Sequence, residues 1–198
     1  MPRFIESIKL LNGAFFNLEY HQLRINRTGA KFFPHSKIPD LQFLLSEIEK
    51  PVIGLFKCRI VYDQEIHSIE FNSYQIKPIH SLKIVRSDAI DYDFKFENRD
   101  HLNELYHSRA ETDDIVIVKN GLVTDSSYAN LIFKKGDKWV TSSSYLLNGT
   151  MRQQLIKSGE ISCETITQND IRTFDKVKLI NSMIGMDGPE IEVLKVIL

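Results

Sequence analysis

Lys95 is the first residue whose type and setting could do chemistry. It lies between Phe94 and Phe96, at the end of an apolar extended stretch just before an expected helix. Apolar surroundings disfavour the ammonium form of a lysine, and a neutral amine can attack a carbonyl carbon to form an imine. The alternative is an ordinary surface lysine on a strand, because lysine is seldom buried.

Asp125 is a second candidate, at the end of a predicted strand. It follows Leu122-Val123-Thr124 and precedes Ser126-Ser127. A buried carboxylate at this place could hold the proton of a pyridinium ring, which makes such a ring an electron sink. The alternative is a turn-forming aspartate bonded to backbone amides.

The segment Gly149-Thr150-Met151-Arg152 leads into a predicted helix. A glycine at a helix start allows close approach of the backbone, and the free N–H groups and the helix dipole favour a phosphate. Arg24, on an earlier predicted helix, is a second phosphate candidate. The alternatives are a plain capped helix and a solvated arginine. An amine, an acid and a phosphate site are the groups that would hold a phosphorylated pyridine aldehyde.

The elements expected to position these residues form two small α+β domains, residues 1–88 and 89–198, divided at the polar segment 87–93. A ligand would commonly sit in a cleft between such domains. In the first domain the patterns predict strands 4–11, 52–62, 66–74 and 83–86, a helix from the N-cap Asn17 to a stop at Gly29, and a helix from Pro39 to before Pro51. In the second they predict a helix over 98–109, a β-rich stretch with an Asn120-Gly121 hairpin and a turn at Gly136, a helix from about residue 150, and strands 177–180 and 191–197.

Composition excludes several other classes of function. The formal net charge of -1 gives no basic footprint for nucleic acid, and no apolar run has the length of a membrane span. The N-terminus is interrupted by charges too early for a signal peptide. Cys58 and Cys163 form no CxxC pair and are expected to be reduced thiols in a cytoplasmic protein. The six histidines lack metal-ligand spacing, so no metal is predicted.

Five motifs together resemble the class IV aminotransferase family, the fold-type IV enzymes of pyridoxal 5'-phosphate (PLP). His21-Gln22-Leu23-Arg24 resembles the family's HxxR, whose arginine contacts the PLP phosphate. Lys95-Phe96-Glu97-Asn98-Arg99 resembles a lyase-type KxxNR, whose lysine forms the internal aldimine. The other three matches are Val123-Thr124-Asp125 through Asn130-Leu131 with TExxxxN, Leu147 through Arg152 with the LxGxxR phosphate loop, and Ile180-Asn181-Ser182 with a strand end that also touches the phosphate.

The resemblance implies an α+β fold of the D-amino acid aminotransferase-like type, with PLP in the cleft between the domains. It implies Lys95 as the catalytic residue and a cofactor site made of Arg24, Asp125, Gly149, Thr150, Met151, Asn181 and Ser182. Position 125 departs from the family, because Asp stands where Glu is usual. Arg99-Asp100 replaces the Asn-Tyr pair of branched-chain transaminases, which favours the lyase-like branch. Arg59 and Tyr128 are candidates for binding the substrate.

The function that the resemblance implies is that of a PLP-dependent lyase similar to 4-amino-4-deoxychorismate lyase. Such an enzyme converts aminodeoxychorismate, a small molecule with an amino group, to 4-aminobenzoate and pyruvate in folate synthesis. The alternatives are a class IV transaminase that acts on branched-chain or D-amino acids, and a non-catalytic relative that uses the scaffold for binding. Family members are usually homodimers, so a homodimer is expected here.

Overall fold

The computed structural model describes residues 1–197 and groups them into two compact units. The first unit comprises Met1–Gln75 and Phe94–Asn98, and the second comprises Ile76–Asp93 and the described residues from Arg99 onward. This grouping differs from the expected boundary at residue 88, because β5 (Leu82–Arg86) pairs in parallel with β6 of the second unit. Residue 198, the last of the predicted second domain, lies outside the described residues.

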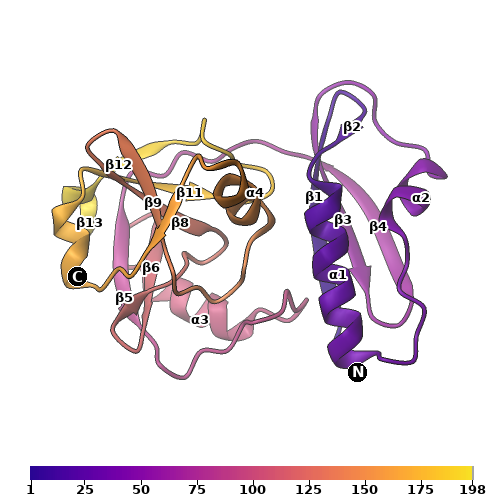
Figure 1. The fold of residues 1–198 in the computed structure, drawn as a ribbon, viewed down its shortest axis with the longest axis horizontal. Helices are drawn as coiled ribbons and strands as arrows, with labels where there is room; N and C mark the ends of the chain where they lie inside the picture. Colours follow the sequence, from indigo (N-terminus) through magenta and orange to yellow (C-terminus); the bar gives the residue numbers. More distant parts are fainter. Residues whose placement is uncertain (198) are drawn as a thin grey trace. The chain divides into compact units, whose positions relative to one another are not determined.

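The first unit is an antiparallel four-stranded sheet with two helices, and α1 lies along the sheet (Figure 1). The strand order is β2-β1-β3-β4, and β1 pairs with β3 over its whole length. The elements are β1 (Phe4–Leu11), β2 (Ala14–Phe15), α1 (Leu18–Phe32), α2 (Leu41–Ser46), β3 (Leu55–Tyr62) and β4 (Ile66–Ser73). The buried face of β1 carries Phe4, Glu6, Ile8 and Leu10, all fully buried, because alternate residues of a strand point to the same side. This face places one acid within an otherwise apolar layer.

The helices of the first unit differ from the sequence prediction at their ends. Asn17 precedes α1 as predicted, but Gly29 does not stop the helix, which continues to Phe32. A β-carbon at Gly29 would overlap the Cδ1 atom of Ile38, so the glycine allows close packing instead of ending the helix. The second helix begins after Asp40, whose carboxylate accepts a hydrogen bond from the Phe43 N–H group, and it is shorter than predicted.

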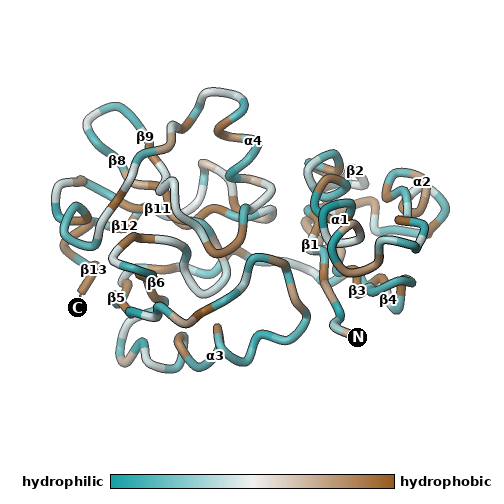
Figure 2. The backbone as a smooth tube through the Cα atoms, turned by 60° about the horizontal axis from the view of Figure 1, so that its bottom comes forward, coloured by the Kyte–Doolittle hydropathy of each residue, from teal (hydrophilic) through white to brown (hydrophobic). Residues whose placement is uncertain are grey.

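The second unit contains a five-stranded and a four-stranded sheet. The five-stranded sheet has the order β10-β9-β8-β11-β12, and the four-stranded sheet has the order β13-β5-β6-β7. Besides β5, the elements are α3 (Asp100–His107), β6 (Asp114–Lys119), β7 (Leu122–Val123), β8 (Asn130–Lys135), β9 (Lys138–Ser142), α4 (Thr150–Ser158), β10 (Ser162–Glu164), the 3-10 helices η1 (Asn169–Thr173) and η2 (Val193–Lys195), β11 (Lys176–Ile180), β12 (Glu190–Glu192) and β13 (Val196–Ile197). Strands β5 and β6 are largely hydrophobic, whereas α3 is mainly hydrophilic (Figure 2).

The prediction of one continuous strand over 191–197 is wrong. The chain forms β12, then the one-turn helix η2, and then β13. Strand β12 pairs with β11, whereas β13 pairs with β5 in the other sheet. The segment therefore links the two sheets of the second unit.

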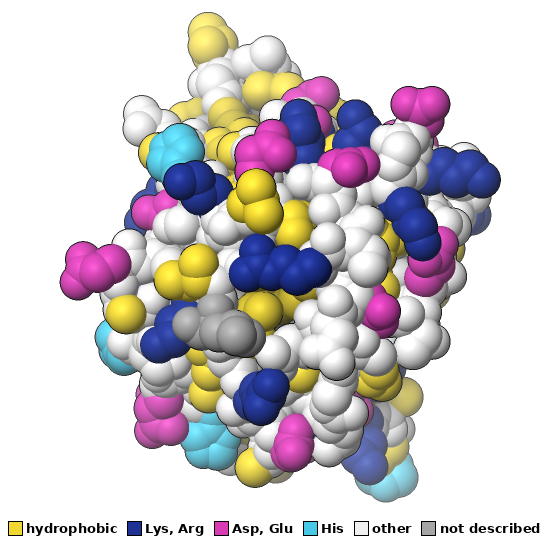
Figure 3. All heavy atoms as spheres, turned by 90° about the vertical axis from the view of Figure 1, so that its left-hand side faces the viewer, with side chains coloured by type: hydrophobic (Ala, Val, Ile, Leu, Met, Phe, Trp, Pro, Cys, Tyr) yellow, Lys and Arg dark blue, Asp and Glu magenta, His cyan; other side chains and the backbone are white. Residues whose placement is uncertain are grey.

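Charged side chains of both signs are interspersed on the surface, as one face of the protein shows (Figure 3). Within residues 1–197, no helix is long and apolar enough to cross a membrane. The same residues contain no group of three or more His, Cys, Asp or Glu side chains placed to hold a metal ion. Cys58 is buried and Cys163 exposed, and both are free thiols.

Candidate functional site

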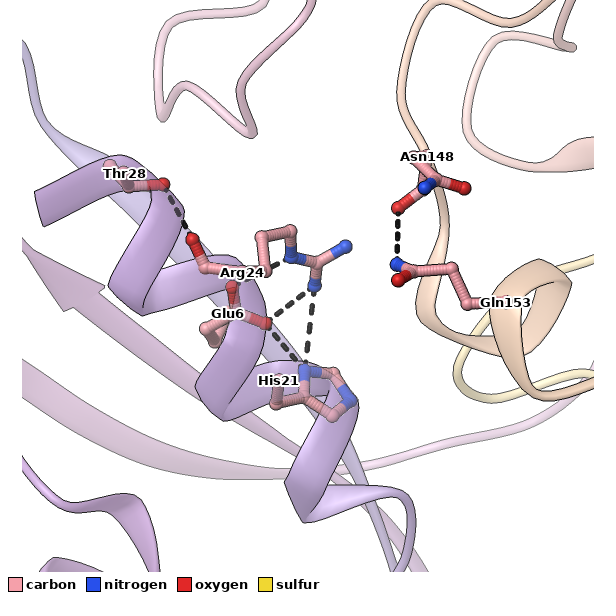
Figure 4. A network of polar contacts seen from close by, with 6 residues as sticks. All are labelled: Glu6, His21, Arg24, Thr28, Asn148 and Gln153. Carbon is pink, nitrogen blue, oxygen red and sulfur yellow. Dashed lines mark hydrogen bonds and ion pairs between the residues drawn. The ribbon is translucent and has the colours of Figure 1, made fainter. Parts of the chain in front are cut away.

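Glu6, His21 and Arg24 form a buried polar cluster in the first unit (Figure 4). Glu6 comes from β1, and the other two residues lie on α1 three positions apart, so they share one face of the helix. Arg24 donates from Nε to Glu6 Oε1 at 2.8 Å and from Nη2 to Glu6 Oε2. The Glu6 and His21 side chains are fully buried, and that of Arg24 is 9% exposed. The carboxylate therefore fixes both α1 side chains.

The charges in this cluster follow from burial and from the ion pair. Burial alone would raise the pKa of Glu6, but the charge and hydrogen bonds of Arg24, with the hydrogen bond to His21, lower this pKa to about 2. Burial lowers the pKa of His21, and this outweighs the opposing effect of Glu6. Neutral His21 then donates from Nδ1 to the carboxylate. Its Nε2 atom is buried and has no hydrogen-bond partner among residues 1–197.

Glu6→Gln is expected to destabilise the protein by about 2 kcal/mol near pH 7, because the buried Arg24 charge loses its counter-charge. The pKa of Glu6 in the folded state lies below its usual value of 4.5. Its carboxylate thus stabilises the fold above about pH 4.5, and this contribution is lost as the pH falls towards 2. Urea unfolding at several pH values should show the two proteins converge in acid. Exposed Glu49→Gln is the control, and a constant difference at all pH values would contradict this account of the ion pair.

Lys95 lies at the centre of a three-residue turn in the segment before α3. The Phe96 N–H group donates to the Phe94 carbonyl at 2.9 Å, and the Lys95 carbonyl accepts from the Ile5 N–H group of β1 at 2.9 Å. The rings of Phe94 and Phe96 pack against Phe4 in the core. The Lys95 side chain is half-buried, and its charge contributes to the lowered pKa of His21. The turn therefore holds Lys95 near the buried cluster.

Arg59, on β3, is a second charged group beside this turn. Its Nη2 atom donates to Glu97 Oε1 at 3.0 Å, and both side chains are partly exposed, 28% and 33%. The structure thus brings Arg59 close to the segment that carries Lys95. A carboxylate already engages its guanidinium.

Asp125 lies in the second unit and is buried, with 6% of its surface exposed. Its Oδ1 atom accepts from Asn130 Nδ2 at 2.8 Å, and its Oδ2 atom accepts from the Leu147 N–H group at 2.9 Å. Burial raises the pKa of Asp125 to about 7, although these hydrogen bonds and the charge of Arg152 act against the rise. Asp125 is therefore an acid that can exchange a proton near neutral pH.

Helix α4 begins at Thr150, with Gly149 as an N-cap that makes no side-chain capping bond. The Thr150 hydroxyl is buried and lacks a hydrogen-bond partner in the described part of the chain. The start of α4, with N–H groups that no side chain caps and with this hydroxyl, is a suitable place to bind an anion. Arg152 faces elsewhere: it donates to Asn148 Oδ1 at 3.0 Å and to the Ser142 carbonyl at 2.9 Å. Gln153 also donates to the Asn148 carbonyl (Figure 4).

Four other predicted site residues, Asn181, Ser182, Met151 and Tyr128, also lie in the second unit. Asn181 follows β11, in which Ile180 pairs with Asn130, and its side chain accepts from the Met183 N–H group at 2.8 Å. Ser182 is next in the chain and half-buried. Met151 is half-buried and packs on the apolar cluster that includes Ile180. Tyr128 is half-buried and packs against the larger core of this unit.

Comparison with known proteins identifies the family. The model of the amino-transferase class IV family matches residues 96–187. An uncharacterized protein of Haemophilus influenzae is 38% identical over 188 residues, covering 94% of this chain and 100% of its own length. A crystal structure from Haemophilus somnus, provisionally named a 4-amino-4-deoxychorismate lyase, is 33% identical, with a TM-score of 0.89 over 94% of this chain and 98% of its own. The chain belongs to the class IV aminotransferase family.

The fold of this class IV protein is accordingly the fold-type IV α+β architecture predicted from the motifs. An aminotransferase from Brucella abortus, solved with bound PLP, has the same fold, with a TM-score of 0.71 and 15% identity over 98% of this chain and 81% of its own. At that identity the likeness shows the fold alone.

Sequence reasoning gave no role to three buried residues that hold the candidate side chains: Glu6 and His21 in the first unit and Asn130 in the second. Glu6 carries a usable signal, since it occupies an inward position in the alternating run Phe4 to Leu10. His21 and Asn130 belong to quoted motifs but received no role of their own. His21 bonds to Glu6, 15 residues before it on another element, and Asn130 bonds to Leu147, 17 residues after it, as well as to Asp125 in its own motif. Spacing along the sequence does not reveal the longer of these contacts.

Proposed function

We propose that this class IV protein binds PLP and acts as a lyase that converts 4-amino-4-deoxychorismate to 4-aminobenzoate and pyruvate. One observation carries the proposal of the cofactor. In the second unit, the turn at 147–149 lies next to two groups. Asp125, a buried acid with a raised pKa, accepts a hydrogen bond from the Leu147 N–H group of this turn. Helix α4, whose first residue Thr150 has a buried hydroxyl without a partner among the described residues, begins directly after the turn. This donor set fits a molecule that carries a basic ring nitrogen and a phosphate.

Each residue of the site then has a defined task. The Thr150 hydroxyl and the N–H groups at the start of α4 bind the phosphate, with Asn181 and Ser182 from the end of β11, and Met151 packs beside them. Arg24 adds positive charge, and Glu6 fixes its orientation. Asp125 holds the proton of the ring nitrogen. PLP, when bound, draws electrons from the carbon that carries the substrate's amino group.

Lys95 is the proposed catalytic residue. Its amine is the group that would hold the cofactor, and it would accept and return a proton at the substrate carbon. The turn that holds it is bonded to β1, which fixes the backbone from which the amine extends. Arg59 and Tyr128 remain the proposed contacts of the substrate's carboxylates and ring.

The choice of a lyase rests on two observations. The relative from Haemophilus somnus that carries the lyase name is 33% identical over nearly its whole length. Arg99 also stands where branched-chain transaminases have the first residue of an Asn-Tyr pair, and its Nη2 atom donates to the Ser127 carbonyl at 2.6 Å, next to the Asp125 turn. We further propose a cytoplasmic homodimer that serves folate synthesis, and a monomer by light scattering would rule out the dimer.

The proposal predicts that the purified protein with added PLP releases 4-aminobenzoate and pyruvate in equal amounts from aminodeoxychorismate. Fluorescence of 4-aminobenzoate and a coupled assay of pyruvate measure the two products. Branched-chain and D-amino acids with 2-oxoglutarate are the comparison substrates. Transamination of these without release of 4-aminobenzoate would assign the protein to the transaminases. Absence of any PLP absorbance would point to a binding function.

A further inference from the structure

Asn130 is the first residue of β8 and lies opposite Asp125 across a single bridge between their backbones. Its side chain is buried, with 5% of the residue exposed. The Asn130 Nδ2 atom donates to Asp125 Oδ1 at 2.8 Å and to the Leu147 carbonyl at 2.9 Å. One amide group therefore joins the acid to the turn that precedes α4.

Leu147 closes this arrangement into a ring. Its carbonyl accepts from Asn130, and its N–H group donates to Asp125 Oδ2 at 2.9 Å. Because two acceptors face the same end of the Asn130 side chain, that end must be the NH2 group. The orientation of the amide is thus determined, and its Oδ1 atom points to the remaining side.

Gly149 occupies that side. Its backbone angles, φ -65° and ψ 147°, suit any residue, so the conformation does not require glycine. A β-carbon there would overlap Asn130 Oδ1 and lie 3.2 Å from Asn130 Cγ. Asn130 can move away only by giving up the hydrogen bonds that hold Asp125 and Leu147. The need for glycine therefore comes from Asn130.

We propose that Asn130 is a positioning residue that binds the Asp125 carboxyl and the Leu147 carbonyl with one NH2 group, and that Gly149 is glycine to make room for it. This inference rests on the proposed function, in which Asp125 holds the ring nitrogen and the 149–150 segment holds the phosphate. Asn130 then sets the spacing between the groups that bind the two ends of the cofactor, although it touches neither end.

A double-mutant cycle on the apoprotein tests the steric part. Gly149→Ala is expected to lower the melting temperature by about 5 °C, as overpacking does. In the Asn130→Ala background the same change should cost little, because the obstructing amide is gone. In Asn130→Leu, which restores the volume without the donor, Gly149→Ala should again be costly. Equal costs in all three backgrounds would overturn the proposal.

Gly185→Ala is the matched control for this cycle. A β-carbon there meets only the Met151 side chain, at ordinary contact distances of 3.7 Å to Cε and 3.9 Å to Sδ. Its effect on the melting temperature should be small and the same in every Asn130 background. A dependence of the control on residue 130 would mean that general loosening, and not the Gly149 contact, explains the cycle.

A second readout separates positioning from mere stability. The hydrogen bond from Asn130 favours the ionised form of Asp125. Asn130→Ala and Asn130→Leu should each raise the pKa of Asp125 by about 1, measured by carbon NMR of labelled aspartate in the apoprotein, and weaken PLP binding about tenfold. An unchanged pKa would overturn the positioning role. If the unsubstituted protein binds no PLP, the proposed function fails, and the cycle and the pKa still decide the role of Asn130.

Discussion

Lys95→Ala is expected to abolish covalent attachment of PLP and to lower the rate of product formation by about a thousandfold or more. The physical reason is the loss of the one amine assigned both to attachment and to proton transfer. Incubation of the unsubstituted protein with PLP should give a visible absorbance band that borohydride removes. After reduction, mass spectrometry should find the pyridoxyl group on the peptide that contains residue 95.

The control for this prediction is Lys57→Ala. Lys57 lies on β3 of the same unit and is half-buried, as Lys95 is. The Lys57 variant should keep the absorbance band and the rate. The Lys95 variant should still fold, because backbone hydrogen bonds and the packing of the Phe96 ring against Phe4 help to hold the turn. Attachment at a different lysine would remove the catalytic assignment.

The sequence predicts those elements whose structure depends on local patterns. The run from Phe4 to Leu11, closed by Asn12-Gly13, predicts β1, and Asn120-Gly121 predicts the tight connection of β6 and β7; both are confirmed. Prediction fails where distant residues decide the outcome. Gly29 resembles a helix stop, yet α1 continues, because the glycine serves contact with Ile38.

The candidate site shows the same division. The residue types of Lys95, Asp125 and Thr150 indicate which chemistry each could perform. The sequence does not reveal that Asn130 and Leu147 bond both oxygens of Asp125, because these bonds depend on the register of β8 and on the path of the 143–149 segment. Motif spacing therefore names the reacting groups, whereas the residues that orient them emerge only from the fold.

Asp125→Asn is expected to remove the part of the pH dependence of stability between about pH 4 and pH 7 that comes from this carboxyl group. The pKa of Asp125 is about 7 in the folded protein and 3.8 in its ordinary environment. The folded state therefore holds this proton where the unfolded chain releases it, and stability falls as the pH rises through this window. The full loss is about 4 kcal/mol above pH 7. Urea unfolding at pH 4 and pH 8 measures most of this loss.

The asparagine variant cannot ionise, so its unfolding free energy should change far less between these two pH values. The substitution also lowers the unfolding free energy by a similar amount at every pH. The reason is that the new amide NH2 group faces a donor, either Asn130 Nδ2 or the Leu147 N–H group. The difference between the pH values, and not the offset, is therefore the test. Asp137→Asn, at an exposed turn, should leave the pH dependence unchanged. If Asp125→Asn retained the full dependence, another buried acid would be its source.

The same substitution should impair the proposed PLP-dependent activity while it relieves the protein of a buried charge. A neutral amide cannot balance a protonated ring nitrogen, so we expect product formation to fall by about a hundredfold or more. Burial of this acid opposes folding at neutral pH, and in the proposed function its charge balances the ring nitrogen. A variant with unchanged activity would show that Asp125 serves only the turn. In that case its hydrogen bonds to Asn130 and Leu147 would be its whole role.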